Sequence, residues 1–279
     1  MNTLYEELSL KCSKITTQLY STSFSMGISM LDAKYQEPIY SIYGFVRLAD
    51  EIVDNMHVYN KRDLLNNLKK DYSESIKNKI SLNPILNSFQ KTVNKYNIDL
   101  QLIEQFIKSM EMDLDKDLIY DKAKYDYYIL GSAEVVGLMC LKIFVDGDEL
   151  EYQKLSFFAK KLGSAFQKIN FLRDVKSDFH ELGRTYFPDV NLKKFSDETK
   201  KNIEKDIEKD FEESYKGILN LPKPIRGGVL LAYYYYQNLL HKIKKKSAKK
   251  ILQKRIRISN FKKLILLIYC QIINKLNWL

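Results

Sequence analysis

The sequence predicts an all-α protein, and three observations support this. First, apolar residues recur with the 3.6-residue period of an amphipathic helix along most of the 279 residues. Second, strand-like alternation is absent over any useful length. Third, only 10 Gly and 5 Pro are available to interrupt the periodic segments. No Gly/Pro/Ser-rich linker and no repeat of fixed period divides the chain, so we expect a single domain over residues 1–279.

The periodic segments predict ten helices in succession. Several boundaries are marked in the sequence: Ser196 can cap a helix start, Asn83 and Pro84 open another helix, and Pro222 and Pro224 end one helix or begin the next. On this basis we expect helices over about residues 3–20, 38–56, 61–78, 83–95, 99–114, 122–145, 148–178, 196–219, 224–246 and 259–275.

Charge is concentrated near the end of the chain. The net charge is +10, and eleven Lys and Arg residues lie between His241 and Lys263, where no acidic residue occurs. Such a segment suits nucleic acid, anionic lipid, a phosphorylated substrate or a solvated helix face. Because no zinc spacing, RNP-like motif or Gly-rich nucleotide loop accompanies it, we do not expect nucleic acid as a partner.

The location is predicted from the cysteines and from the apolar segments. Three cysteines at unrelated spacings make no disulfide framework, so we expect a cytoplasmic protein. No membrane span is expected, because the nearest candidate, Leu264–Leu279, is interrupted by Asn274 and Lys275. We interpret this segment as a packing helix. Peripheral contact of its end with the inner membrane surface stays open, and so does the oligomeric state.

The stretch "RLADEIVDN" (Arg47–Asn55) places acidic side chains inside an apolar segment. On a helix, Arg47, Asp50 and Asp54 fall on one narrow stripe with Glu51 at its edge, and most of the remaining circumference is apolar. We therefore expect a largely buried helix with one polar seam.

A second acidic stripe occurs in "LGSAFQKINFLRDVKSDF" (Leu162–Phe179). Gln167, Asn170, Asp174 and Asp178 are spaced so that a helix keeps all four on one face, again among apolar residues. A single Asp-x-x-x-Asp pair is commonly just a solvated helix face. Two such pairs in apolar helices are different, because buried carboxylates need compensating cations. Hard oxygen ligands favour Mg²⁺, with Mn²⁺ as an alternative, and Mg²⁺ commonly bridges carboxylates to a diphosphate.

Five segments together resemble the squalene/phytoene synthase family of head-to-head prenyltransferases, over about residues 20–260. They are "YSTSFSMG" (Tyr20–Gly27), "RLADEIVD" (Arg47–Asp54), "YILGSAEVVGLMCLKIF" (Tyr128–Phe144), "LGSAFQKINFLRDVKSDF" (Leu162–Phe179) and "GRTYFP" (Gly183–Pro188). The resemblance implies an isoprenoid-synthase helical bundle whose central cavity takes Mg²⁺ and two molecules of one prenyl diphosphate.

The resemblance also implies roles for particular residues. The ligands of the metal–diphosphate clusters would be Asp50, Asp54, Asp174 and Asp178, assisted by Gln167 and Asn170. Arg47 would contact diphosphate, and Ser21 and Ser23 would border the site near a phosphate. Tyr128 matches a cavity tyrosine that helps the cyclopropyl intermediate form or rearrange. Tyr236 and Arg255 match a late tyrosine and a diphosphate-contacting arginine.

The resemblance implies a reaction but leaves the product open. We favour phytoene made from two geranylgeranyl diphosphates through a cyclopropylcarbinyl diphosphate, as the first step of carotenoid biosynthesis, with no NADPH. The alternatives are squalene or dehydrosqualene made from two farnesyl diphosphates, and a non-catalytic scaffold or assembly protein. One departure concerns Ser132-Ala133-Glu134, where many members have Val-Ala-Gly. We expect Glu134 to face a neighbouring helix.

Overall fold

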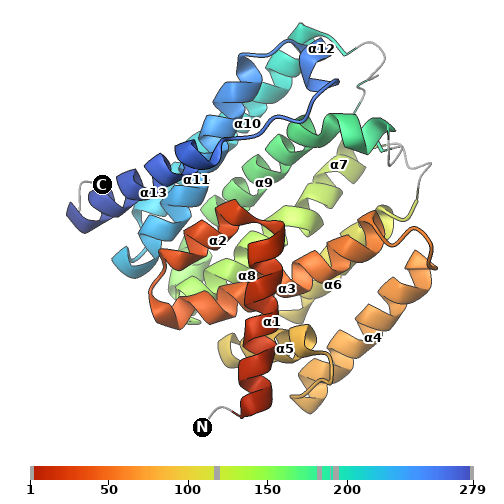
Figure 1. Cartoon of the computed structure of the whole chain (residues 1–279), viewed down its shortest axis with the longest axis vertical. Coiled ribbons are helices and arrows are strands. Elements are labelled where there is room, and N and C mark those ends of the chain that lie inside the picture. The colour runs from red at the N-terminus through yellow and green to blue at the C-terminus, as the bar shows by residue number, and fades with distance from the viewer. Residues whose placement is uncertain (1–2, 116–119, 181–183, 189, 191–194, 277–279) are drawn as a thin grey trace.

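The computed structural model describes residues 3–115, 120–180, 184–188, 190 and 195–276 (Figure 1). Within these ranges the chain is helical and contains no strand, so the all-α prediction is confirmed. The single-domain prediction for residues 1–279 stays a prediction, because both ends of that range lie outside the described residues.

The described helices, in chain order, are α1 (Leu4–Tyr20), α2 (Thr22–Ser29), α3 (Ala33–Asp54), α4 (Lys61–Asn78), α5 (Pro84–Tyr96), α6 (Leu100–Met112), α7 (Lys122–Ile129), the π-helical turn η1 (Leu130–Glu134), α8 (Val135–Phe144), α9 (Glu149–His180), α10 (Asp197–Leu219), α11 (Lys223–Lys244), α12 (Ala248–Ile251) and α13 (Asn260–Leu276).

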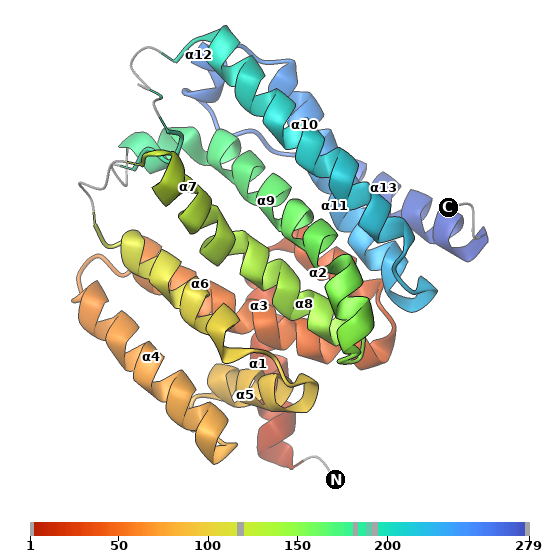
Figure 2. The ribbon, with the colours of Figure 1, turned by 180° about the vertical axis from the view of Figure 1, so that it is seen from behind.

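The long helix α9 and the α7–η1–α8 segment lie in the middle of the bundle (Figures 1 and 2). On one side of them lie α3, α4, α5 and α6, and on the other lie α10, α11 and α13. Each side has its own cluster of buried apolar residues. The cavity described below lies between the two sides.

Close backbone packing fixes the middle of the bundle. A Cβ on Gly131 of η1 would lie 2.0 Å from Ser109 Oγ of α6, and a Cβ on Gly163 of α9 would lie 2.6 Å from the carbonyl oxygen of Ala133. Only glycine allows these approaches. The apolar period predicts one uninterrupted helix over 122–145 and gives no sign of the π-turn that divides it.

Three other helix assignments differ from expectation, and the shortest is α12, whose four residues Ala248–Ile251 lie between two predicted helices. Helix α3 begins at Ala33 and contains Pro38, whereas the sequence analysis placed the start at residue 38. Pro38 lies near the start of α3, where its missing N–H removes a single hydrogen bond, and the helix continues on both sides of it. Helix α2 was not predicted, because eight residues are too few for a clear period. Its start is marked by Ser21, which is extended and caps it.

One described helical stretch, Lys122–Phe144, is long and apolar enough to span a membrane by length and composition. The apolar pattern had pointed to Leu264–Leu279 as the nearest candidate, and this stretch was not identified from it. The stretch contacts α6 and α9, and Tyr128 and Gly137 within it line the central cavity. Helices buried in a protein core also meet these criteria of length and composition.

Candidate active site

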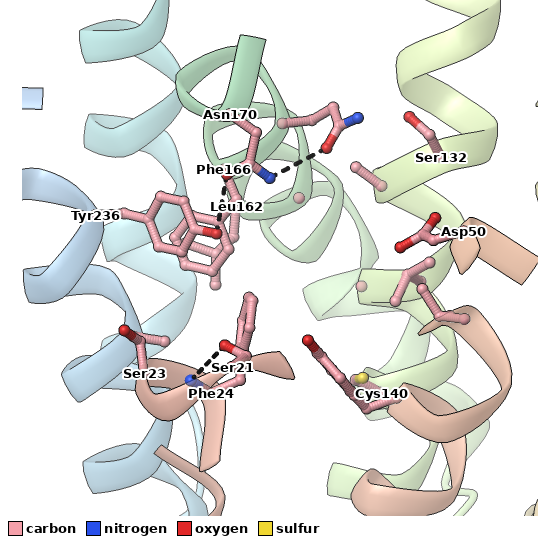
Figure 3. A pocket seen from close by; sticks show the side chains of 18 of the residues that line it. Ser21, Ser23, Phe24, Asp50, Ser132, Cys140, Leu162, Phe166, Asn170 and Tyr236 are labelled. Atoms are coloured by element: carbon pink, nitrogen blue, oxygen red, sulfur yellow. Dashed lines mark hydrogen bonds between the residues drawn. The ribbon is translucent and has the colours of Figure 1, made fainter. Parts of the chain in front are cut away.

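A cavity of about 750 Å³ lies between α2 and α3 on one side and α9 and α11 on the other, with η1 and α8 in its wall (Figure 3). Every site residue chosen from the sequence lines it: Ser21, Ser23, Arg47, Asp50, Asp54, Tyr128, Gln167, Asn170, Asp174, Asp178, Tyr236 and Arg255. The structure thus brings together residues that are far apart in the chain. Their chemical roles stay predictions.

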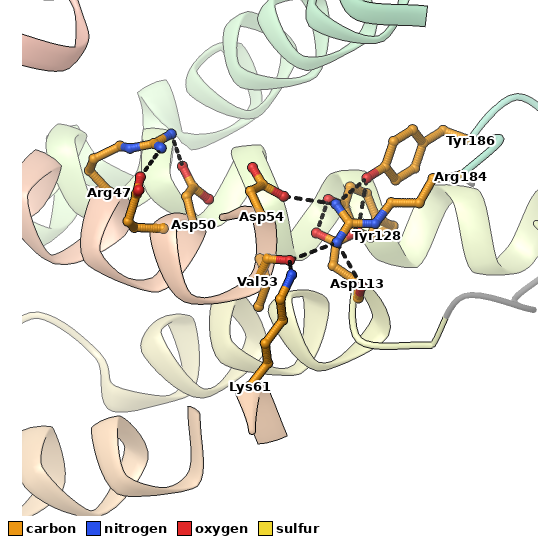
Figure 4. A network of polar contacts seen from close by, with 10 residues as sticks. Arg47, Asp50, Val53, Asp54, Lys61, Asp113, Tyr128, Arg184 and Tyr186 are labelled. Carbon is orange, nitrogen blue, oxygen red and sulfur yellow. Dashed lines mark hydrogen bonds and ion pairs between the residues drawn. The ribbon is translucent and has the colours of Figure 1, made fainter. Parts of the chain in front are cut away.

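The first acidic stripe lies on the C-terminal half of α3 (Figure 4). Burial, and then the nearby charge of Asp54, raise the pKa of Asp50 to about 7. Arg47 compensates it only partly, because its Nη1 lies 3.8 Å from Asp50 Oδ2 while its Nη2 pairs with Glu51. The guanidinium of Arg47 also lies over the ring of Tyr20, 4.2 Å from the ring centroid. Asp50 is therefore a cavity carboxylate whose negative charge is only partly compensated by Arg47.

The second acidic stripe lies on the C-terminal half of α9. Asp174 accepts a hydrogen bond of 3.0 Å from Arg173 Nε and forms an ion pair of 2.6 Å with Arg255 Nε. Burial, and then the charge of Asp174, raise the pKa of Asp178 to about 8. In the first stripe Asp54 pairs with Arg184 at 2.8 Å, so each stripe holds one aspartate paired with arginine and one that lacks enough positive charge.

The two stripes lie at the same end of the cavity, because Arg184 donates from Nη1 to Asp54 of α3 at 2.8 Å and from its backbone N–H to the carbonyl oxygen of Asp178 of α9 at 2.7 Å. This fixes the polarity of the cavity. It is acidic where the C-terminal halves of α3 and α9 meet. It is apolar toward their N-terminal halves, where the lining includes Ile39, Ile42, Leu155, Phe158, Ile218 and Leu221.

Beside the acidic end lies a buried network that the sequence analysis missed (Figure 4). Asp113, at the end of α6, accepts hydrogen bonds from the hydroxyls of Tyr128 (2.6 Å) and Tyr186 (2.9 Å). Arg184 donates from Nη1 to Asp54 Oδ1 (2.8 Å) and from Nη2 to the Asp113 carbonyl oxygen (2.7 Å). Burial raises the pKa of Asp113 to about 6. The network connects the Tyr128 hydroxyl to the first acidic stripe.

The sequence held only partial signals for this network. Arg184 and Tyr186 lie in the quoted "GRTYFP" segment but were not selected individually. Asp113, like Asp50, is an acidic residue among apolar ones near the C-terminal end of a predicted helix. This shared pattern could have identified Asp113 as a site residue.

Aromatic and amide side chains line the wall opposite α3 (Figure 3). The Tyr236 hydroxyl donates to Asn170 Oδ1 (3.2 Å), and Asn170 Nδ2 donates to Gln167 Oε1 (3.3 Å). The Phe166 ring stacks on Tyr236 with 4.0 Å between centroids. Ring faces attract positive charge, so this wall can stabilise a cation in the cavity.

Ser21 and Ser23 border the cavity at the start of α2. The Ser21 hydroxyl accepts from the Phe24 backbone N–H at 3.2 Å, as an N-cap. Helix N-termini favour anions, and this agrees with the expectation that these serines lie near a phosphate.

Two further expectations concern residues outside this set. Glu134 is not among the cavity residues, and the charges of Lys160 and Lys161 on α9 act on it. This agrees with a position facing a neighbouring helix. The histidines were expected at surface or packing positions. His57 and His241 are exposed, although His57 also borders the cavity, and the side chain of His180 lies outside the described residues.

The acidic residues fit a hard cation by chemistry, although the described part of the chain contains no preformed cluster of three or more His, Cys, Asp or Glu side chains that could hold one. Asp50 and Asp178 offer oxygen ligands, and burial, followed by the charge of a neighbouring aspartate, raises the pKa of each. A divalent cation would compensate the negative charge of the ionised carboxylates. The full ligand set stays a prediction.

Two curated proteins are similar in sequence to this chain. The chain is 27% identical over 278 residues to phytoene synthase 1, chloroplastic, of Solanum lycopersicum, which covers 92% of this chain and 66% of that protein. It is also 27% identical over 191 residues to 4,4'-diapophytoene synthase of Staphylococcus haemolyticus, covering 66% of this chain and 64% of the relative. The chain therefore spans slightly less than two thirds of the length of these relatives.

Among solved structures, a dehydrosqualene synthase in complex with a ligand superposes with a TM-score of 0.82 at 20% identity, covering 97% of this chain and 98% of that one. The fold is thus that of this synthase. The sequence pattern of the family described as squalene/phytoene synthase matches residues 17–262. The chain belongs to the squalene/phytoene synthase family.

Proposed function

We propose that this protein is a prenyltransferase that joins two molecules of one prenyl diphosphate head to head. The observation that carries the proposal is the polarity of the central cavity: two acidic stripes at one end, and an apolar, aromatic-lined space at the other. The acidic end would hold the metal-bound diphosphates and the apolar end the two prenyl chains.

The residues at the acidic end would have two roles, the binding of metal and the binding of diphosphate. Asp50, Asp54, Asp174 and Asp178 would hold Mg²⁺, which when bound withdraws charge from a leaving diphosphate. Arg47 and Arg255 would bind diphosphate oxygens directly.

The apolar end would protect and guide the reacting chain. Its walls would exclude water from a carbocation, and the stacked rings of Phe166 and Tyr236, which line the cavity, would offer π electrons to it. The Tyr128 hydroxyl, held by Asp113, would be oriented toward the site of ring formation or rearrangement.

For the product we propose phytoene from two geranylgeranyl diphosphates. Each of two stages releases one diphosphate and one proton: the first forms the cyclopropylcarbinyl diphosphate, and the second opens the ring and joins the two C1 carbons. No hydride donor is needed, so NADPH is not expected. A C30 product from farnesyl diphosphate is the second candidate, favoured by the likeness to the diapophytoene and dehydrosqualene synthases.

A product assay tests the proposal. Purified protein is given Mg²⁺ and either geranylgeranyl or farnesyl diphosphate, with and without NADPH, and extracted hydrocarbons are identified by mass. We expect a C40 triene without NADPH. A C30 product would identify farnesyl diphosphate as the substrate, as in the second candidate function. NADPH dependence would then distinguish squalene from dehydrosqualene. The absence of any hydrocarbon would favour a scaffold protein instead.

A further inference from the structure

Helix α13 exposes an apolar stripe, and the exposed Lys275 near the end of the helix is the one charged residue on the same face. At 100° per residue the stripe covers about 140° of the helix. Phe261 is 73% exposed, and the six others are each between 43% and 49% exposed: Leu264, Ile265, Ile268, Tyr269, Ile272 and Leu276. Apolar patches of this kind on a soluble surface mark interaction sites.

The opposite face of α13 is fixed in the fold. Leu266, Cys270 and Ile273 are buried, and the helix packs on α11 and α2. The exposed stripe therefore belongs to a helix with a set orientation. No part of the described chain covers it.

The charge around α13 identifies the kind of partner. No Asp or Glu follows Glu213 in the sequence, and the segment from His241 to Lys263 carries eleven Lys and Arg residues. Among them Lys245, Lys249, Lys250 and Lys262 are exposed. A second copy of this chain would bring the same positive charge to the same face and be repelled. An anionic lipid surface is complementary to both the charge and the apolar stripe.

Helix α1 carries a second exposed apolar row, which consists of Leu4, Leu8, Ile15 and Leu19, each at least half exposed. Helices α1 and α13 both lie toward the viewer in Figure 1 and away from the viewer in Figure 2. Two helices with exposed apolar rows therefore lie on one side of the molecule.

We propose that α13 lies in the interface of an anionic bilayer, with its exposed stripe at the boundary of headgroups and acyl chains and the neighbouring lysines at the lipid phosphates. Helices α2 and α11, on which α13 packs, also form walls of the cavity. Membrane contact would thus occur beside the site.

Vesicle flotation of the full chain tests the proposal. We expect binding to phosphatidylcholine vesicles containing phosphatidylglycerol, and binding about tenfold or more weaker to phosphatidylcholine alone or at high salt. The double variant Ile265→Glu/Ile268→Glu should lose binding to the anionic vesicles. The matched control is Leu82→Glu, which alters a 94% exposed leucine between α4 and α5 and should bind as wild type.

Circular dichroism and the unfolding midpoint should be unchanged in the double variant, because both side chains are exposed. A second variant, Lys245→Gln/Lys249→Gln/Lys250→Gln, keeps the apolar stripe and should weaken binding to anionic vesicles alone. The proposal is overturned if the wild-type protein does not bind anionic vesicles, or if the double variant binds them as tightly as wild type does. It is also overturned if wild type is a dimer in solution that the double variant makes monomeric, since the stripe would then be a self-association surface.

Discussion

Asp113 shows how one buried carboxylate can organise a site without lying on either acidic stripe. It accepts from the hydroxyls of Tyr128 and Tyr186, and it shares Arg184 with Asp54. Fixed in this way, the Tyr128 hydroxyl has one orientation at the cavity wall. Asp113 is thus a positioning residue for the proposed reaction.

Asp113→Asn should lower kcat/KM for hydrocarbon formation by about tenfold or more, because both tyrosine hydroxyls lose a charged acceptor. The free energy of unfolding should change little, since burial already raises the pKa of Asp113 to about 6 and makes its charge costly. Steady-state kinetics and urea unfolding measure the two effects. Asp71→Asn, at an exposed position of α4, is the matched control. Unchanged kinetics in Asp113→Asn would contradict the positioning role.

The position of a site residue could be predicted where the site residues share one face of a single helix. The stripes on α3 and α9 follow from helical spacing alone, so Asp50, Asp54, Asp174 and Asp178 could be selected before the fold was known. The Asp113 network could not, because Arg184 is 71 residues from Asp113 and 130 from Asp54. Helical periodicity within one segment does not reveal contacts between residues so far apart in the sequence.

At the scale of elements, the long helices could be predicted from the apolar period, and the exceptions have identifiable causes. The π-turn Leu130–Glu134 depends on glycine contacts between helices, which spacing within one helix does not reveal. Helix α2 was missed because its eight residues follow the single extended residue Ser21. The fold class was therefore predictable, while the shape of the cavity wall was not.

Gly163→Ala should destabilise the fold by about 1–3 kcal/mol, a typical cost of overpacking. The new Cβ would lie 2.6 Å from the carbonyl oxygen of Ala133, a backbone atom that cannot move aside alone. Thermal or urea unfolding measures the change. Lys176→Ala, at an exposed position of the same helix, is the control and should leave stability near wild type. Equal stability of both variants would mean that α9 and η1 are not in close backbone contact.

At the scale of the whole molecule, the acidic end makes stability depend on pH. Folding raises the pKa of Asp50 to about 7 and of Asp178 to about 8, so the folded protein binds more protons than the unfolded chain from about pH 4 up to these values. Without divalent metal, the melting temperature should therefore fall as pH rises from 6 to 8. Scanning calorimetry in chelator-treated buffer measures this.

Mg²⁺ should raise the melting temperature more at pH 8 than at pH 6, because ionised carboxylates bind it and protonated ones do not. In Asp50→Asn the pH dependence and the effect of Mg²⁺ should both be smaller. A melting temperature that rises between pH 6 and 8 without metal would contradict the assignment of Asp50 and Asp178 as uncompensated carboxylates.

The central claim is that the two acidic stripes act together on diphosphate. The most direct measurement is Mg²⁺-dependent release of diphosphate and hydrocarbon from geranylgeranyl diphosphate by wild type, Asp50→Asn and Asp174→Asn, with Asp71→Asn as the control. Each cavity variant should keep the helical circular dichroism of wild type and lose about 100-fold or more of the rate. Full activity in either cavity variant would contradict the claim, because one stripe would then be dispensable.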